Sequence, residues 1–506
     1  MAAYPASAQT GSTQPRSTVP AYDVVVLGAG PAGTSAALRL AALGHRTALV
    51  ERSDFPRPHV GESLSPGIGN ILDYLGLPGL ATAASGLSDL PGWLLWDDPE
   101  PRPILPEQRG PACMVDRARF DALLLDAART RGVAVLQPAR LLASERNGDT
   151  WRLTIRHGAA EMRLHTRLLL DATGRAGQRP RRRLPLSAET LSICARVEAG
   201  TLPHATHIEA LPEGWLWGSP HPAGDYRIMA FVDPVNSLRP AARLSALLER
   251  SRLFNAAQGR VTAVLVRPAT AHCDAEPWRE GRIKLGDAAF ALDPLSSSGV
   301  EKAMRFALQT VIAVNTLLRE PTSTELAREF YEDRLTQAVI THGRWTAGYY
   351  ARAFGMAEQP FWQARAKPWQ LPSDGDASPW WERLRLALAE PASAESVDAP
   401  PLPPISALND PVHAWNRPVA LCPELRIVQV PCVIDDCVRR GAAVAHPALA
   451  HPVAFLAGVE LVPLLDAVPV VGSLGQLVGQ WADTVPRQAA VRMAGWLLQR
   501  GVLRLV

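Results

Sequence analysis

The chain has 506 residues, of which 47% are hydrophobic and 20% are charged, and its formal net charge is +3. This is the composition of a globular protein with a large core and two or three domains, and it excludes an intrinsically disordered chain. The small net charge argues against a strongly basic surface of the kind that binds nucleic acid or anionic membranes.

The six cysteines form no CxxC pair and have no histidine at zinc-finger spacing, so the sequence predicts reduced thiols, no metal site and a cytoplasmic location. The first 20 residues are small and polar, which predicts a disordered tail rather than a signal peptide. No stretch approaches the roughly 20 apolar residues that a membrane-spanning helix requires.

The first clear structural unit spans residues 22–52, "YDVVVLGAGPAGTSAALRLAALGHRTALVER". An apolar strand leads into a G-x-G-x-x-G fingerprint, a helix follows, and a second strand ends in Glu51. Gly28 allows a tight turn, Gly30 lets the backbone approach a pyrophosphate, and Gly33 lets helix and strand pack closely. The motif predicts a dinucleotide site in which Glu51 binds an adenosine ribose; the alternative is a glycine-rich turn without a ligand.

Two later segments favour FAD over NAD. Residues 167–177, "RLLLDATGRAG", predict an apolar strand that closes on Asp171 and a glycine turn. Residues 281–308 predict a strand that ends at Asp287, a Pro-Ser-Gly turn and a helix from Gly299. Asp287 is suited to hold a ribityl hydroxyl, and the amides at the helix start stabilise negative charge on a reduced flavin.

Together with the strings "FPRPHVGESL", "VDRARFDALLLDAA", "DATG", "GWLWGSP" and "GDAAFALDPLSSSGV", these motifs resemble the FAD-dependent monooxygenase superfamily with the para-hydroxybenzoate hydroxylase fold. Within it, the chain is similar to the branch that contains tryptophan halogenases and geranylgeranyl-reductase-like enzymes. The resemblance covers residues 20 to 350 and implies an α/β fold. That fold is a FAD-binding Rossmann-like (GR2-type) domain with an inserted mixed β-sheet substrate domain, here at about residues 185–280.

The resemblance implies that Arg57 and the turn of residues 61–63 lie along the flavin and that Arg117 faces the cofactor. The alternative for Arg117 is an ordinary first-turn arginine on an exposed helix face. The cofactor-binding residues that the motifs and the resemblance imply are Gly28, Gly30, Ala32, Gly33, Glu51, Arg52, Arg57, Gly61, Glu62, Ser63, Arg117, Asp171, Gly174, Gly286, Asp287, Pro294, Ser298, Gly299 and Val300.

The rest of the chain divides by composition. Residues 21–370 form the predicted catalytic region, with helical sequence from 298 onward, and 371–420 read as a proline-rich linker. Residues 421–506 predict strands, three helices near 453–467, 473–485 and 487–500, and a last strand, which resembles a small α+β winged-helix-like domain. The middle helix has no Lys or Arg and carries Asp483, which argues against nucleic-acid binding. Peptide binding, or packing as a lid, is the remaining interpretation.

For enzymes of this superfamily, the resemblance implies a flavin C4a-hydroperoxide that hydroxylates a ring or, in halogenases, oxidises halide for transfer through a catalytic lysine. The pair Trp215 and Trp217 resembles the tryptophan motif of halogenases; the alternative is that both pack as strand residues. No lysine lies between the Gly-Glu turn and this pair, because the first lysine of the chain is Lys284. Arginine has no nucleophilic amine to replace it. Ser296 stands where tryptophan halogenases carry a glutamate.

The remaining resemblance is to flavoproteins thought to oxygenate protein-bound tryptophan during quinone cofactor maturation. The prediction is an FAD-dependent monooxygenase that hydroxylates an electron-rich aromatic substrate, carried on a peptide or protein recognised by residues 421–506. Its electron donor is NAD(P)H or a separate flavin reductase, and O2 is the co-substrate. A flavin-dependent halogenase and a geranylgeranyl-reductase-like enzyme are the alternatives. The predicted catalytic set is Trp215, Trp217, His221 and Glu301, with Glu213 a further polar group; for each acid or base, a solvent-facing or core role is the alternative.

Overall fold

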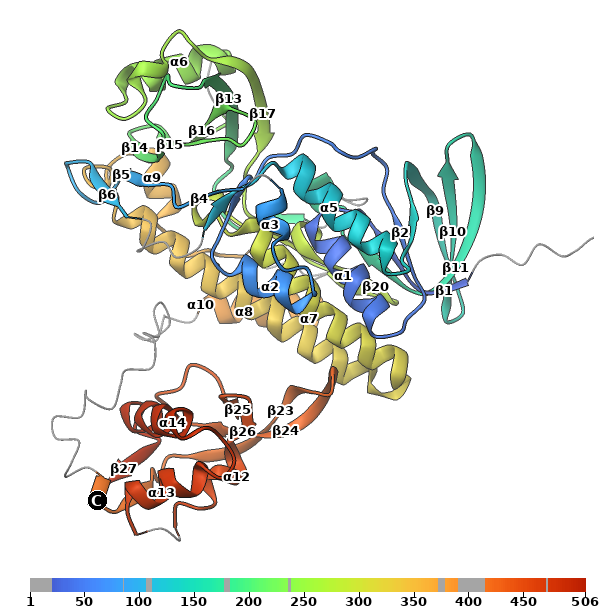
Figure 1. The fold of residues 1–506 in the computed structure, drawn as a ribbon, viewed down its shortest axis with the longest axis vertical. Coiled ribbons are helices and arrows are strands. Elements are labelled where there is room, and N and C mark those ends of the chain that lie inside the picture. The colour runs from blue at the N-terminus through green and yellow to red at the C-terminus, as the bar shows by residue number, and fades with distance from the viewer. Residues whose placement is uncertain are drawn as a thin grey trace, which may run out of the picture.

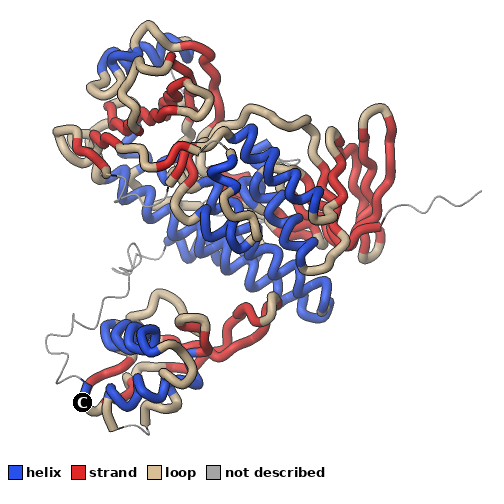
Figure 2. The backbone as a smooth tube through the Cα atoms, viewed as in Figure 1, coloured by secondary structure: helices blue, strands red, loops and turns tan. Residues whose placement is uncertain are grey.

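The computed structural model describes residues 21–84, 86–105, 112–176, 183–234, 238–371, 378–389, 415–469 and 472–506. Figure 1 and Figure 2 show three parts: a central body of sheet and helices, a second sheet at one end, and a C-terminal module below the body. The predicted tail of residues 1–20 and most of the predicted linker lie outside the described residues. Within the described ranges, no helix is long and apolar enough to cross a bilayer.

The central sheet is built around the fingerprint. β1 (Ala21–Leu27), α1 (Pro31–Ala42) and β2 (Thr47–Val50) form a β-α-β unit in which β1 pairs in parallel with β2 and with β11 (Ala160–Asp171). The strand order is β19-β20-β11-β1-β2-β8. A parallel strand is covered on both faces, which explains the uninterrupted apolar run in β1.

The two faces of this sheet have different covers. Val24 and Val26 point into a core formed with α1, α5 (Arg117–Thr130) and α7 (Gly299–Arg319). Val25 and Leu27 point instead into a core formed with the antiparallel strands β9 (Ala139–Asn147), β10 (Thr150–His157) and β11. Shorter elements complete the body: α2 (Ile68–Tyr74), α3 (Leu80–Ala83), β3 (Ser63–Leu64), β4 (Leu87–Ser88), β7 (Cys113–Met114), β8 (Ala134–Leu136), β12 (Arg183–Pro185), β18 (His272–Asp274), β19 (Trp278–Arg279), β20 (Arg282–Lys284) and β21 (Phe290–Ala291).

The second sheet confirms the predicted insertion. Its seven strands have the order β17-β13-β16-β15-β14-β5-β6. Five of them fall within residues 185–280, whereas β5 and β6 come from a much earlier segment that the sequence did not assign to this sheet. β5 pairs in parallel with β14, and all other pairings are antiparallel. The strands are β5 (Gly92–Leu95), β6 (Arg102–Ile104), β13 (Leu191–Glu198), β14 (Thr206–Leu211), β15 (Gly214–Pro220), β16 (Asp225–Val232) and β17 (Thr262–Pro268).

One face of the second sheet packs on α6 (Pro240–Arg250), and the other faces the central body. The inward face meets the end of α8 (Thr324–Ala351) and α9 (Pro360–Arg365). α10 (Pro379–Ala389) falls inside the predicted linker, yet it is helical and buries Trp380 and Trp381 against the body. The predicted linker is therefore partly a packed element of the fold.

The C-terminal module (residues 415–506) has its own apolar core. Its elements are β22 (Val419–Leu421), β23 (Arg426–Ile434), β24 (Cys437–Ala445), β25 (Phe455–Leu456), β26 (Val459–Glu460), α12 (Leu461–Leu465), α13 (Leu474–Trp481), α14 (Arg487–Gln499) and β27 (Leu503–Leu505). Three helices and the last strand lie where the sequence predicts them, except that residues 455–460 form a hairpin instead of the first helical turns.

A two-stranded hairpin connects the module to the body. β23 and β24 extend from the module to α7 and α8, as Figure 1 shows. Asn315 of α7 donates its side-chain amide to the carbonyl of Asp436 at 2.7 Å, and the Val438 amide donates to the Thr316 hydroxyl at 2.8 Å. Arg440 pairs with Glu329 of α8 at 2.5 Å. The hairpin is thus fastened by buried as well as surface bonds.

Candidate active site

The fingerprint glycines differ in what surrounds them. A Cβ at Gly28, where φ is +98°, would lie 2.6 Å from the Ala172 carbonyl oxygen, and a Cβ at Gly33 would lie 1.9 Å from the Gly28 oxygen. These two glycines are required by the packing of the protein itself. At Gly30, no atom of the described chain lies within 4 Å of the Cβ position. The open space is at the N-terminus of α1, where a dinucleotide pyrophosphate binds in such folds.

Glu51 is fixed by the backbone of the same loop. Its carboxylate accepts the Ala29 amide at 2.8 Å and the Ser53 amide at 2.9 Å, and the residue is 3% exposed. The Arg57 guanidinium lies 3.8 Å from this carboxylate and rests over the Phe55 ring at 4.8 Å. Among the described residues, the buried Nε of Arg57 has no hydrogen-bond partner. An unused donor beside the open space fits a bound polar cofactor.

Arg117 stabilises the Gly61–Ser63 turn through hydrogen bonds to backbone carbonyls. It is 4% exposed, forms a two-pronged pair with Asp121 at 3.0 and 3.1 Å, and donates from Nη1 to the carbonyls of Val60 at 2.9 Å and Gly61 at 3.3 Å. The alternative of an exposed first-turn arginine is therefore wrong. Direct contact of Arg117 with the cofactor stays a prediction, since its donors serve the turn.

Glu62 lies in this turn and faces the second sheet. It is 4% exposed, and its carboxylate accepts the Gly61 amide at 2.9 Å. Burial raises the pKa of Glu62, while hydrogen bonds and the positive charges of Arg227 and Arg117 oppose the increase. Because Arg227 belongs to β16, the turn and the substrate sheet are electrostatically coupled.

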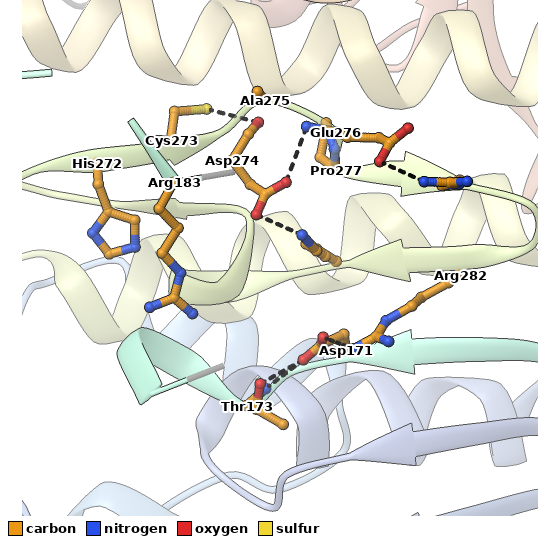
Figure 3. Close-up of polar contacts among 12 residues, drawn as sticks. Asp171, Thr173, Arg183, His272, Cys273, Asp274, Ala275, Glu276, Pro277 and Arg282 are labelled. Carbon is orange, nitrogen blue, oxygen red and sulfur yellow. Dashed lines mark hydrogen bonds and ion pairs between the residues drawn. The ribbon is translucent and has the colours of Figure 1, made fainter. Parts of the chain in front are cut away.

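Two acidic residues at the ends of neighbouring strands have different environments. Asp171 accepts hydrogen bonds from the Thr173 amide and hydroxyl and pairs with Arg282 at 2.5 Å, as Figure 3 shows. Burial alone favours its protonated form, but Arg282 and Thr173 outweigh burial and lower the pKa of Asp171. Asp287 has only a loose pair with Arg175 at 3.5 Å and a carboxylate that is 36% exposed. Asp287 is therefore the freer of the two to bind a ligand hydroxyl.

The segment before α7 is shaped to present amides. Asp293 accepts the Leu295 amide at 3.0 Å, Ser297 has a φ of +48°, and Ser298 begins the helix without a side-chain cap. Within the described residues, nothing lies within 4 Å of a Cβ placed at Gly299. We call residues 293–298 the flavin turn. Uncapped amides at an open helix start fit the pyrimidine side of a reduced flavin.

The close approach of this region to α1 depends on a further predicted residue. A Cβ at Gly286, where φ is +57°, would lie 2.8 Å from the Ala32 methyl group. Gly286 thus lets the strand carrying Asp287 touch the fingerprint helix. The open positions at Gly30 and Gly299, the unused donor of Arg57 and the loosely paired Asp287 each fit a bound FAD. Contacts of individual side chains with FAD stay predictions.

The predicted acid Glu301 is engaged in fixing α7. Its carboxylate accepts the Ser65 hydroxyl at 2.5 Å and pairs with Arg305 at 2.5 Å, and it fills the space beside Gly67. Glu213 pairs with Arg250 at the surface at 2.9 Å. For both residues the geometry favours the alternative role, a structural or solvent-facing one.

His221 follows the tryptophan strand and is 6% exposed. Its Nδ1 lies 3.1 Å from the Ala223 amide nitrogen and 3.3 Å from a carboxylate oxygen of Asp225. Burial, and then the charge of Arg227, lower the pKa of His221, while Asp225 opposes the decrease. Whether His221 contacts a substrate stays a prediction.

Trp215 and Trp217 point to the inward face of the second sheet and are 2% and 7% exposed. Trp215 stacks on Phe231 with ring centroids 4.0 Å apart and meets Trp96 edge-on at 5.9 Å. Buried aromatic residues of the second sheet, α8 and α9 pack together at this face, and we call them the aromatic cluster. They are Trp96, Trp215, Trp217, Phe231, Tyr350, Phe361 and Trp362. Leu295 of the flavin turn packs against the same cluster. The pair thus packs as strand residues while bordering the predicted flavin site.

The sequence missed two residues that join these parts. The Trp215 indole donates to the Tyr350 hydroxyl at 3.2 Å, and the Tyr350 hydroxyl lies 3.2 Å from the Asp293 carboxylate. Burial raises the pKa of Asp293 to about 6. Asp293 lies within the motif "GDAAFALDPLSSSGV", so the sequence offered a reason to consider it. Tyr350 lies in a helix whose sequence matches no motif, so nothing in the sequence pointed to it.

The sequence predicts no metal site, and the structure brings one group of potential ligands together in the part of the chain that it describes. Side-chain ligand atoms of Cys422, Glu424 and His446 lie within 4.8 Å of one another in the C-terminal module. The Nδ1 atom of His446 accepts the Ala448 amide at 3.2 Å, and its buried Nε2 has no hydrogen-bond partner among the described residues. The absence of a metal site stays a prediction.

Comparisons with known proteins agree with this site. The family described as FAD dependent oxidoreductase matches residues 23–177, and the family described as Tryptophan halogenase matches residues 102–374. A tryptophan 2-halogenase from Chondromyces crocatus is 28% identical over 337 residues, covering 61% of this chain and 64% of that relative, just under two thirds of its length. The putative FAD-dependent oxidoreductase LodB from Marinomonas mediterranea is 27% identical over 372 residues, covering 68% of this chain and 96% of LodB.

Two of the solved structures match over nearly the whole chain. CmlS, a flavin-dependent halogenase, is 22% identical with a TM-score of 0.72, and the match covers 96% of each chain, which shows a shared fold. The other structure has the higher sequence identity. It is peptidyl tryptophan dihydroxylase QhpG, described as essential for tryptophylquinone cofactor biogenesis. The two chains are 26% identical with a TM-score of 0.68, and the match covers 96% of this chain and 100% of QhpG. The correspondence thus includes the C-terminal module as well as the catalytic body.

Proposed function

The chain belongs to the tryptophan halogenase family and is an FAD-dependent oxidoreductase, and we propose that it oxygenates an electron-rich aromatic substrate. The cofactor is FAD, and bound reduced FAD supplies the activation of dioxygen for attack on the ring. The observation that carries the proposal is the aromatic cluster on the inward face of the second sheet, which borders the flavin turn through Leu295.

Halogenation is the second candidate because the tryptophan pair resembles the halogenase motif. That chemistry requires an amine positioned between the turn at residues 61–63 and the pair, and the sequence has no lysine there. Ser296 also occupies the glutamate position, and in the structure it accepts the Ser298 hydroxyl at 2.8 Å. The missing lysine and the missing glutamate are both residues that halogenases use to transfer the halogen, whereas oxygenation of a ring needs neither.

The residues of this chain have distinct roles in the proposed reaction. Gly30, Arg57, Asp287 and the amides from Gly299 onward bind and orient the cofactor. The aromatic cluster is buried and excludes water beside the flavin turn. Glu62 and Arg227 supply the charged groups where the turn meets the sheet.

We further propose that the aromatic ring is a tryptophan carried on a peptide or protein. This rests on the match to peptidyl tryptophan dihydroxylase QhpG along the full length of that chain, including the module of residues 415–506. The C-terminal module has its own apolar core and is fastened to the body by the β23–β24 hairpin, which suits a part that grips an extended partner. The segment of residues 473–485 has no Lys or Arg and carries Asp483, which argues against nucleic acid as the partner.

The test is a reaction of the purified full chain loaded with FAD. The flavin is reduced anaerobically with NADPH or with a separate flavin reductase, and air is then admitted with a tryptophan-containing peptide, with and without bromide. We expect a peptide heavier by one or two oxygen atoms and no brominated product. A brominated product that depends on enzyme and reduced flavin would establish halogenation instead. Reduction of an alkene without oxygen consumption would place the enzyme with the reductases.

A further inference from the structure

Lysine is scarce in this protein, and one lysine lies at the predicted flavin site. The chain contains only three lysines among its 52 basic residues. Lys284 pairs with Asp274 at 2.5 Å, and Lys367 is exposed. Lys302 is half-buried in the first turn of α7, three residues beyond Gly299. The helix start that faces the flavin therefore also carries an amine.

The amine of Lys302 is in contact with a buried histidine. His342 of α8 is 2% exposed, and its Nδ1 lies 3.1 Å from the Lys302 Nζ. The other ring nitrogen, Nε2, accepts the backbone amide of Asp293 at 3.1 Å. The rings of Phe290, Trp345 and Trp369 surround the imidazole at centroid distances of 6.1, 6.1 and 5.7 Å.

These two hydrogen bonds determine where the protons are. A backbone amide only donates, so Nε2 of His342 holds a lone pair, and the neutral ring carries its proton on Nδ1. That Nδ1–H points at Lys302 and requires an acceptor. An ammonium group has three donors and no lone pair, so two donors would face each other. The contact is satisfied only when Lys302 is a neutral amine.

The surroundings act in the same direction. Burial lowers the pKa of Lys302 to about 8; Glu301 opposes this change, and Arg305 reinforces it. Burial places the pKa of His342 well below its ordinary value, and any charge on Lys302 would lower it further, so the ring does not become a cation. Glu301 and Arg305 of α7 and His342 of α8 are the titratable groups acting on the amine. Donation from His342 stabilises the neutral form further.

We infer that Lys302, held as a neutral amine by His342, accepts the proton that leaves the aromatic ring of the substrate during oxygenation. The inference rests on the proposed function. Trp345 and Tyr349 lie on the same face of α8 as His342, are half-buried, and have ring centroids 4.3 Å apart. The Trp345 ring is centred 6.1 Å from the His342 imidazole, and Arg352 lies over the Tyr349 ring at 4.3 Å. A substrate ring that stacks on Trp345 would lie on the side of α8 that carries the histidine in contact with Lys302.

The step balances as follows. One oxygen atom from dioxygen bonds to a ring carbon, and the other leaves as water, with two electrons supplied by NAD(P)H through the flavin. The proton on that ring carbon moves to the lone pair of Lys302, and the electrons of the broken C–H bond restore the aromatic ring. Lys302 is then an ammonium ion, which the His342 N–H disfavours, so the proton passes on to water and the neutral amine returns.

The protonation state can be measured without any substrate. In the full chain with FAD bound, ¹³C-labelled dimethylation of the lysines gives three side-chain signals, and Lys302→Arg identifies the one of interest. We expect the Lys302 signal to titrate at or below about pH 8, well under the ordinary lysine pKa of about 10.4. In His342→Gln, the Lys302 signal should titrate at higher pH. An ordinary pKa for Lys302 in the wild type would overturn the inference.

The catalytic role is tested with a tryptophan-containing peptide whose indole ring is deuterated. We expect Lys302→Met to lower kcat by about 100-fold, as for loss of a general base, with flavin content unchanged. Deuteration should slow the variant more than the wild type, because removal of the ring proton becomes limiting. Lys367→Met is the control. An unchanged rate and pH profile in Lys302→Met would refute the role, whereas failure of the wild type to oxygenate any peptide would refute the proposed function and leave the titration to decide the protonation state.

Discussion

The indole N–H of Trp215 donates to the hydroxyl oxygen of Tyr350 at 3.2 Å, across 135 residues of chain. The same hydroxyl lies 3.2 and 3.4 Å from the two carboxylate oxygens of Asp293. Because Trp215 belongs to the second sheet and Asp293 to the flavin turn, one phenol of α8 fixes both sides of the site. The position of the tryptophan strand is therefore coupled to that of the turn.

Replacing this phenol should loosen the coupling. In Tyr350→Phe, the buried indole N–H loses its acceptor and the Asp293 carboxylate loses a donor. Removing one partner of a buried hydrogen bond costs roughly 1–3 kcal/mol. We expect a lower melting temperature and a higher KM for the aromatic substrate with near-normal FAD content. Tyr349→Phe, at a half-buried position of the same helix, is the matched control; equal melting temperatures for the two variants would contradict the coupling.

The buried carboxyl of Asp293 should give a pH-dependent stability. Its pKa is raised from 3.8 to about 6 in the folded protein, so folding favours the protonated form. That contribution is fully present below about pH 4 and is lost as the pH rises through 6, a change of about 3 kcal/mol. Asp293→Asn keeps an oxygen for the Leu295 amide and cannot ionise. The wild type should therefore lose stability relative to the variant between pH 4 and pH 7.

Melting temperatures of both proteins, measured with saturating FAD at pH 4.5 and pH 7.5, check this prediction. The sign is the decisive result. If the wild type gains stability relative to Asp293→Asn as the pH rises, the carboxylate is stabilised in the folded state and the assignment of a costly buried charge is wrong.

The FAD site is tested at the open glycine. Gly30→Val places a side chain in space that no described atom of the protein occupies, and φ at this position is −70°, which valine adopts. The fold should therefore survive, while the pyrophosphate is excluded from the start of α1. We expect a folded, colourless protein beside a yellow wild type.

Gly69→Val is the control, since Gly69 is exposed in α2 and its Cβ position is also free of contacts. It should remain yellow. Equal flavin content in well-folded Gly30→Val would sink the assignment of the fingerprint to FAD binding.

The sequence predicted best where function depends on neighbouring residues. The turn at Gly28 and Gly30, the helix after it and Glu51 at the end of the next strand are local features with known spacing, and the structure has them. The sequence predicted that Arg117 faces the cofactor site but not that it binds the turn at residue 61, because a position at a helix start does not tell which loop will cover it. Contacts between distant segments, such as Trp215 with Tyr350, depend on how separately folded layers meet, which no local pattern encodes.

The same distinction applies to the lysines. The absence of a lysine before the tryptophan pair was visible in the sequence, and it argued against halogenation. That Lys302 meets His342 follows from the crossing of α7 and α8, two helices whose sequences carry no sign of the contact. Similarly, β5 ends at Leu95 and joins the second sheet from well before β13, the first inserted strand, which begins at Leu191, and only the tertiary structure reveals this pairing.

The last prediction concerns removal of the C-terminal module. Every cofactor motif precedes residue 310, so a chain cut before residue 415 should still bind FAD. However, removing the β23–β24 hairpin takes away the acceptor of the Asn315 side-chain N–H and the amide that donates to the Thr316 hydroxyl, although Asn315 Oδ1 keeps His45 and Thr316 keeps the Ile312 carbonyl. A buried group that loses its partner costs roughly 1–3 kcal/mol. We therefore expect a yellow protein with a lower melting temperature. The hairpin contacts lie sixteen residues along α7 from Gly299, roughly 24 Å from the flavin end, which is why the flavin should remain.

If the module recruits a protein substrate, kcat/KM should fall for the full-length partner but not for a short tryptophan peptide. A truncated protein that is insoluble or colourless would show instead that the module is part of the catalytic fold, and an equal loss for both substrates would rule out recruitment.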